Sequence, residues 1–105
     1  MPASAVAAHR VRLHPGADRD LEEGLAFYSA RSPIAAERSL SDVEAALDLI
    51  AEAPDRWPLH RAGTRRHVLS AFPYSIVYRV GTGAIEVFAV AHAKRQPLYW
   101  ARRHF

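Results

Sequence analysis

Two dense apolar runs in the second half of the chain flank a Gly-Thr-Gly turn. They cover residues 74–80 and 84–92 and are rich in β-branched and aromatic side chains, as strands are. Gly81 and Gly83 permit the positive φ that tight hairpin loops need. The pattern therefore predicts a β-hairpin. Alternation places Ile85, Val87 and Ala89 on one face, and the opposite face is also apolar, so this sheet requires cover from the rest of the chain.

Two shorter strands are predicted outside this hairpin. Residues 10–14 alternate polar and apolar side chains, as a half-buried strand does, whereas residues 1–9 show no clear pattern. Residues 64–70 alternate as well, with Arg66 and Val68 on the face opposite His67. Trp57, in the loop before them, is expected to plug the edge of the core.

Apolar residues at helical spacing predict two helices between the first strand and the other three. The first stripe runs through Ala17, Leu21, Gly24, Leu25 and Tyr28. The first turns of this helix are rich in acidic residues, which the positive end of the helix dipole favours. They are Asp18, Asp20, Glu22 and Glu23. Ser32 and Pro33 stop the first helix and start the second, and Pro54 ends the second. The second stripe runs through Ala36, Leu40, Val43, Leu47 and Ile50.

The resulting order β-α-α-β-β-β predicts an α+β fold. A helical hairpin over residues 15–53 packs on one face of a mainly antiparallel, four-stranded sheet. A length of 105 residues suits one domain, 1–105. The expected interior contains Leu21, Leu25, Leu40, Val43, Leu47, Ile76, Tyr78, Val87 and Ala89.

The net charge of +3 conceals a strong asymmetry between the two halves. Residues 1–55 carry ten acids and five arginines, a net charge of −5, whereas residues 56–105 carry nine basic residues and the single acid Glu86, a net charge of +8. Thirteen of the fourteen Lys and Arg residues are arginine, which binds carboxylates and phosphates in a bidentate manner. Two explanations stay open: the acidic helices neutralise a basic sheet internally, or an anionic partner docks on the second half.

Several function classes are excluded by composition and spacing. Cysteine is absent, which rules out disulfide scaffolds and thiolate chemistry. No apolar run is long enough for a membrane span, and residues 1–10 lack the features of a secretory signal, so a cytoplasmic protein without membrane contact is expected. The six histidines lack metal-ligand spacing and no Gly-rich phosphate loop is present, so neither a metal nor another cofactor is expected.

Four segments, taken in this order and spacing, resemble the RelE/ParE superfamily of toxins from type II toxin–antitoxin systems, and within it the ParE-like branch. They are HPGADRDLEEGLAFY (14–28), ERSLSDVEAALDLIAEAPDRWP (37–58), RRHVLSAFPYSIVYRV (65–80) and IEVFAVAHAKRQPLYWARR (85–103). The resemblance covers almost the whole chain and implies the same β-α-α-β-β-β fold. It also implies a small bacterial toxin of a plasmid-stabilisation system, neutralised in a toxin–antitoxin hetero-oligomer by a cognate antitoxin that wraps over it.

The superfamily contains two mechanisms. A resemblance to the RelE-like members implies a ribosome-dependent mRNA endonuclease. Such an enzyme needs a proton acceptor, a proton donor and cations beside the phosphate. His92 and Tyr99 are the best acid–base candidates here, with Arg95 as a cation and His67 as a weaker candidate. Each has a structural explanation: His92 as a strand-end histidine hydrogen-bonded to the backbone, and Tyr99 with Trp100 as closure for the core.

A resemblance to the ParE-like members instead implies an inhibitor of DNA gyrase that has no catalytic residues of its own. The chain has one lysine and one acid in its second half, so the lysine-rich cluster of the ribonucleases is not evident and gyrase binding is favoured. The antitoxin is expected in an apolar groove between helices and sheet, its acids meeting Arg65, Arg66, Arg79 and Arg95. The predicted binding set for target or antitoxin is Arg65, Arg66, Arg79, His92, Lys94, Arg95, Tyr99 and Trp100. The alternatives are an mRNA endonuclease acting with the ribosome, and an inactive toxin relic.

Overall fold

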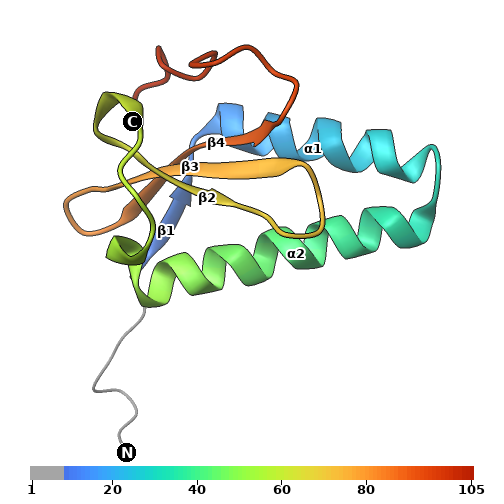
Figure 1. The fold of residues 1–105 in the computed structure, drawn as a ribbon, viewed down its shortest axis with the longest axis horizontal. Coiled ribbons are helices and arrows are strands. Elements are labelled where there is room, and N and C mark those ends of the chain that lie inside the picture. Colours follow the sequence, from blue (N-terminus) through green and yellow to red (C-terminus); the bar gives the residue numbers. More distant parts are fainter. Residues whose placement is uncertain (1–8) are drawn as a thin grey trace, which may run out of the picture.

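The computed structural model describes residues 9–105, so most of the segment expected to lack a pattern lies outside the described residues. Two helices cover one face of a four-stranded sheet, as Figure 1 shows, and this confirms the predicted α+β fold and element order. The elements are β1 (Val11–Leu13), α1 (Pro15–Ser29), α2 (Pro33–Glu52), β2 (Arg65–Val68), β3 (Tyr74–Val80) and β4 (Ile85–His92). Within residues 9–105, no helix combines the length and apolarity that crossing a membrane requires.

The sheet has the strand order β1-β4-β3-β2. β1 runs parallel to β4, with Val11 opposite Ile85, and the other two pairings are antiparallel. The two strands of the predicted hairpin are therefore the central strands, which explains why both of their faces are apolar.

A register shift between Val77 and Tyr78 interrupts the pairing of β3 with β4. Val77 lies opposite Ala89, but Tyr78 lies opposite Val87, so Phe88 is an extra residue in β4. Ala89 is fully buried as predicted, yet it belongs to the apolar cluster on the face away from the helices. The predicted shared face for residues 85, 87 and 89 is therefore wrong, because the bulge reverses the alternation after Val87.

Both helices begin with a capping side chain followed by proline. His14 Nδ1 accepts a hydrogen bond of 2.8 Å from the Gly16 amide, and Pro15 occupies the first turn of α1. Ser32 Oγ accepts one of 3.2 Å from the Ala35 amide at the start of α2. The predicted break at Ser32-Pro33 is confirmed.

The main core lies between the helices and the sheet, and the helical stripe that enters it is rotated relative to the predicted one. Ile50 and Val43 are buried as expected, together with Ala46 and Ser39. The predicted core residues Leu21, Leu25, Leu40 and Leu47 are only partly buried. Small side chains therefore occupy the centre of the α2 stripe, with leucines at its flanks. Trp57 packs at the edge of this core, as predicted.

A second apolar cluster covers the sheet face opposite the helices. The C-terminal segment, residues 93–105, folds back over this face, and its Trp100 packs with Val77, Phe88 and Ala89. Trp100 is 3% exposed, so its predicted role in closing a core is confirmed, but the core in question is this second one.

Candidate functional site

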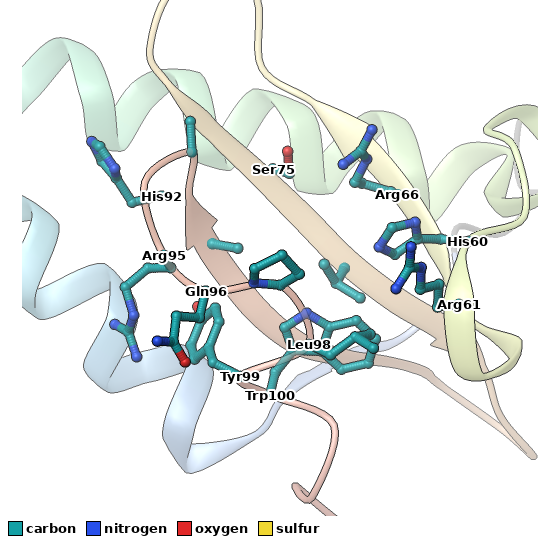
Figure 2. Close-up of a pocket in the computed structure, with 14 residues that line it drawn as sticks. His60, Arg61, Arg66, Ser75, His92, Arg95, Gln96, Leu98, Tyr99 and Trp100 are labelled. Carbon is teal, nitrogen blue, oxygen red and sulfur yellow. The ribbon is translucent and has the colours of Figure 1, made fainter.

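A hollow of about 310 Å³ lies on the sheet face opposite the helices. Its floor is formed by β3 and β4, one wall by β2 and the loop before it, and the other by the turn after β4 and the C-terminal segment (Figure 2). We call it the basic pocket. It is lined by His60, Arg61, Arg66, Ser75, Val77, Ala91, His92, Ala93, Arg95, Gln96, Pro97, Leu98, Tyr99 and Trp100.

Arg61 and Arg66 supply the positive charge of one wall. Within residues 9–105, neither guanidinium forms an ion pair or a side-chain hydrogen bond. Burial, and then the charges of Arg66 and Arg61, lower the pKa of the neighbouring His60 below its ordinary value of 6.5. His60 is therefore neutral at pH 7, while two unpaired cations face the hollow.

His92 and Tyr74 lie together at the end of the sheet. His92 Nδ1 accepts a hydrogen bond of 3.0 Å from the Lys94 amide, and its ring meets the Tyr74 ring edge-on at 5.1 Å. This backbone bond is the structural role that the sequence suggested for His92. Among the described residues no carboxylate lines the basic pocket, so no acidic partner orients His60 or His92 for proton transfer there.

Tyr99 is held by the first helix through its hydroxyl. The Tyr99 Oη donates a hydrogen bond of 2.9 Å to Asp20 Oδ2, and the Arg95 guanidinium lies 3.8 Å from the centre of the Tyr99 ring. Burial, followed by the hydrogen bond to Asp20, raises the pKa of Tyr99 far above its ordinary value. A hydroxyl with so high a pKa is a poor proton donor at neutral pH. Tyr99 therefore contributes to the pocket as a lining residue and not as an acid.

Asp20 is the carboxylate on which the C-terminal segment depends. It is 6% exposed and accepts hydrogen bonds from the Val90 amide at 3.1 Å and from Arg103 Nη1 at 2.8 Å, besides Tyr99. Asp20 is therefore the buried counter-ion of Arg103, a role that its interpretation as a complement to the helix dipole did not include. A usable signal existed: Asp20 falls between Ala17 and Gly24 on the apolar stripe of α1.

The structure brings five of the eight predicted binding residues into the basic pocket: Arg66, His92, Arg95, Tyr99 and Trp100. Arg65 instead donates a hydrogen bond of 2.6 Å to the Trp57 carbonyl, and Arg79 pairs with Glu86 at 2.6 Å. Lys94 lines a neighbouring hollow against α1.

His67, the weaker acid–base candidate, packs edge-on against Trp57 at 4.5 Å. It shares the helix-facing side of its segment with the core residue Leu69, so the sheet separates it from the basic pocket.

His60 and Arg61 are pocket residues that sequence reasoning missed. They precede a turn in which Ala62 and Gly63 both have positive φ, and the His60 amide donates to the Thr64 carbonyl at 2.7 Å. This closed turn brings Arg61 beside Arg66. The available signal was the spacing of two basic pairs, His60-Arg61 and Arg65-Arg66, around a glycine.

Chemically, the pocket suits an anionic group held next to an apolar one. Guanidinium groups bind carboxylates and phosphates in a bidentate manner, and Trp100 and Leu98 offer an apolar wall. Among residues 9–105 there is no group of three or more His, Cys, Asp or Glu side chains that could hold a metal ion.

Comparisons with known proteins agree on one family. Residues 11–97 match the family described as the ParE toxin of the type II toxin–antitoxin system, parDE. The chain is 33% identical over 91 residues to toxin ParE2 of Mycobacterium tuberculosis, covering 84% of this chain and 85% of the relative. It is 35% identical over 88 residues to putative toxin Y4kP of Sinorhizobium fredii, covering 83% and 91%.

Two further similarities concern the wider group and the fold. The chain is 38% identical over 64 residues to toxin RelE2 of Caulobacter vibrioides, covering 61% of this chain and 72% of the relative. A solved structure of the chromosomal ParDE system from P. aeruginosa superposes with a TM-score of 0.73 at 18% identity, covering 83% of this chain and 98% of that one. At this identity the superposition supports the fold alone.

Proposed function

This chain belongs to the ParE toxin family of type II toxin–antitoxin systems, and from that premise we propose that it inhibits DNA gyrase by binding, without making or breaking a bond itself. The observation that carries the proposal is the basic pocket, where Arg61 and Arg66 are unpaired among the described residues while the acid–base candidates are held in structural roles. Such a pocket favours recognition of an acidic surface over proton transfer.

In this proposal the basic pocket receives an acidic group of the target. Arg65 and Arg79 take no part, because each is engaged within the chain. A cognate antitoxin neutralises the toxin in the cytoplasm by forming a hetero-oligomer with it, and its acidic residues meet Arg61, Arg66 and Arg95 instead of the four arginines expected from sequence. The positive charge of the second half supports an acidic partner of this kind.

The second candidate is a ribosome-dependent mRNA endonuclease. Two observations favour it: the similarity to toxin RelE2, and the presence of His60 and His92 in the same hollow as the arginines. The third candidate is an inactive toxin relic, which an experiment must distinguish from both active toxins.

The test is to induce the toxin alone in a bacterial host, then record the DNA-damage response and map mRNA ends in the same culture. Gyrase inhibition predicts growth arrest with a DNA-damage response and filamentation, and no new mRNA ends. Codon-phased mRNA cuts that disappear in His60→Ala or His92→Ala, without a DNA-damage response, would replace the proposal with the ribonuclease. Normal growth at confirmed expression would leave the relic.

A further inference from the structure

Trp100 carries a hydrogen-bond donor that the chain itself does not use. The residue is 3% exposed and lines the basic pocket, yet its indole N–H takes part in no hydrogen bond within residues 9–105. Figure 2 shows this nitrogen on the edge of the indole that faces the interior of the pocket. Buried tryptophan N–H groups usually have an acceptor, because an unpaired buried donor is costly. The pocket therefore holds a buried donor whose acceptor is not supplied by the described chain.

Three further donors line the same hollow. They are the Arg61 and Arg66 guanidinium groups and the Ser75 hydroxyl, and within residues 9–105 none of them forms an ion pair or a side-chain hydrogen bond. Since no carboxylate of the described residues lines the pocket, these donors have no anionic acceptor there. The charge and the donors of the pocket therefore call for an anion from outside the chain.

The backbone is strained in both walls of this pocket. Within residues 9–105, the non-glycine residues with positive φ are Ala62, at +59°, and Leu98, at +62°. Ala62 follows Arg61 in one wall, and Leu98 lines the opposite wall. Residues with a Cβ rarely adopt this conformation, and where the surrounding structure enforces it, the position is commonly a ligand or active site. The strain supports a binding role for this hollow.

A phosphate group fits these donors better than a carboxylate does. A phosphate monoester carries a charge of about −1.5 to −2 at pH 7 and three strong acceptor oxygens, whereas a carboxylate has one charge and two oxygens. The two unpaired arginines match the charge of the dianion. Because a phosphate group is tetrahedral, it can accept from a guanidinium in the wall and from the Trp100 indole at the same time.

The shape of the pocket indicates a small ligand. Its volume of about 310 Å³ lies at the lower end of the range of small-molecule sites, about 300–1,000 Å³. Pro97 and Leu98 offer an apolar wall beside the donors. A nucleic-acid strand would require a continuous track of cations, but Arg65 in β2 and Arg79 in β3 are engaged within the chain. The pocket therefore suits a terminal phosphate with room for an attached group.

We propose that the basic pocket is a binding site for a terminal phosphate group, carried by a small phosphate ester such as a nucleotide or supplied as inorganic phosphate. Arg61 and Arg66 bind its oxygens from the wall, and the Trp100 indole N–H donates to it from below. This site goes beyond the proposed function, because it does not depend on gyrase as the target. Where the proposed function also holds, the phosphate ligand competes with gyrase for the pocket.

The first experiment follows the indole N–H signals of the isotope-labelled chain by NMR. Trp57 and Trp100 are its two tryptophans, and Trp57 packs at the helix side of the sheet, so it serves as an internal control. Inorganic phosphate and adenosine monophosphate should each shift the Trp100 signal and leave the Trp57 signal in place. Acetate and adenosine, which lack the phosphate, should bind at least about tenfold more weakly.

The same titration identifies the source of the phosphate. Tighter binding of adenosine monophosphate than of inorganic phosphate would identify an ester as the preferred ligand, because the attached group then uses the apolar wall. Equal affinities would identify inorganic phosphate, since the attached group would contribute nothing.

The second experiment removes the cations. Arg61→Gln with Arg66→Gln should weaken phosphate binding about tenfold or more. The matched control is Arg19→Gln with Arg38→Gln, which removes the same charge from exposed positions of α1 and α2, outside the pocket. It should change the affinity less than about twofold, because salt screens charges at that distance.

His60 provides an independent readout of the bound anion. Burial, and then the charges of Arg66 and Arg61, lower the pKa of His60 in the unliganded chain. A phosphate group held by these arginines offsets their charge, so saturation with phosphate should raise the pKa of His60. Histidine NMR signals recorded against pH, with and without phosphate, measure the change.

Several results would overturn the inference. They are an unmoved Trp100 signal, binding of acetate as tight as that of phosphate, full affinity of the Arg61/Arg66 double variant, or an unchanged pKa of His60 in excess phosphate. If gyrase fails to bind the wild-type chain, the proposed target is wrong, and the phosphate titration still decides this site. If phosphate binds but does not weaken gyrase binding, the site is supported and the proposed function loses the pocket as its contact surface.

Discussion

Asp20 and Arg103, 83 positions apart in the chain, form a largely buried ion pair with hydrogen bonds of 2.8 and 3.2 Å. Arg103 Nη1 also donates to the Phe88 carbonyl at 2.9 Å, and the Arg103 side chain packs so closely on Gly16 that a Cβ added there would clash with its guanidinium. Together with the Tyr99–Asp20 bond, this pair fastens the C-terminal segment to α1. The wall of the basic pocket that this segment forms therefore depends on a residue of the first helix.

Removal of the Asp20 carboxylate should destabilise the fold strongly. Asp20→Ala leaves Arg103, whose side chain is 16% exposed, without its counter-ion, and breaking one partner of such a pair costs about 3–5 kcal/mol. Urea denaturation measures the change. Asp18→Ala, an exposed acid in the first turn of α1, is the control and should cost less than about 1 kcal/mol.

A double variant separates charge from packing at this pair. Asp20→Leu with Arg103→Leu should be more stable than either single variant, because no unpaired charge remains buried. If the destabilisation of the double variant equalled the sum of the two single destabilisations, the two residues would act independently, which would contradict the coupling of the C-terminal segment to α1 through this pair.

The rotated stripe of α2 gives a prediction for the main core. Ile50 is fully buried, so Ile50→Ala should cost about 2–5 kcal/mol in the free energy of unfolding. Leu49→Ala, at a side chain that is 40% exposed, should cost less than about 1 kcal/mol, and the partly buried Leu47 should fall between the two. A larger loss of stability for Leu49→Ala than for Ile50→Ala would contradict the set of α2 residues that the structure shows to be buried.

The order and type of the elements were predictable because they follow from local periodicity. The hairpin, the break at Ser32-Pro33 and the two helical stripes are each visible within a short window of sequence. The bulge was not predictable in this way, since residues 87–90 are all apolar and offer no polar position to reveal the slip.

The candidate site was harder to predict because its parts come from distant segments. Arg66, His92 and Trp100 were found by charge and residue type, but Arg61 joins them through a turn whose Ala62 has a φ of +59°. The place of Asp20 on the apolar stripe of α1 indicates a buried carboxylate, but no local pattern identifies Arg103 as its partner. The intramolecular contacts of Arg65 and Arg79 could not be foreseen, because a sequence shows charges without their partners.

The unpaired arginines should matter for binding and little for folding. Arg61→Gln with Arg66→Gln should change the free energy of unfolding by less than about 0.5 kcal/mol, as substitutions at exposed sites do. Under the proposed function, the same double variant should weaken gyrase binding about tenfold or more, because charge-assisted hydrogen bonds contribute about 1.5–3 kcal/mol each.

Arg65→Gln is the matched control for this pair, and the opposite pattern is expected of it. It loses the 2.6 Å bond to the Trp57 carbonyl and should destabilise the fold by about 1–2 kcal/mol while the folded protein still binds. Normal gyrase binding by the Arg61/Arg66 double variant would show that the basic pocket does not receive the target.

Tyr99 allows a prediction about alkaline stability. Burial and the bond to Asp20 raise the pKa of Tyr99 in the folded state above its ordinary value of 10.0, so folding favours the protonated phenol. This contribution is fully present below pH 10 and is lost as the pH rises above it, when the unfolded chain releases the proton more readily. Few other groups titrate there, since the chain has four tyrosines, one lysine and no cysteine.

Tyr99→Phe tests this role and the absence of catalysis together. At neutral pH it should lose about 1.5–3 kcal/mol of stability with the bond to the buried carboxylate, and its stability should fall less steeply above pH 10 than that of the wild type. Tyr74 and Tyr78, whose pKa values burial also raises, are the same in both proteins and cancel in the comparison. Growth inhibition by the folded variant should persist, because in this proposal the Tyr99 hydroxyl serves structure. Loss of toxicity with unchanged stability and an unchanged alkaline profile would instead assign the hydroxyl to chemistry, and with it favour the ribonuclease.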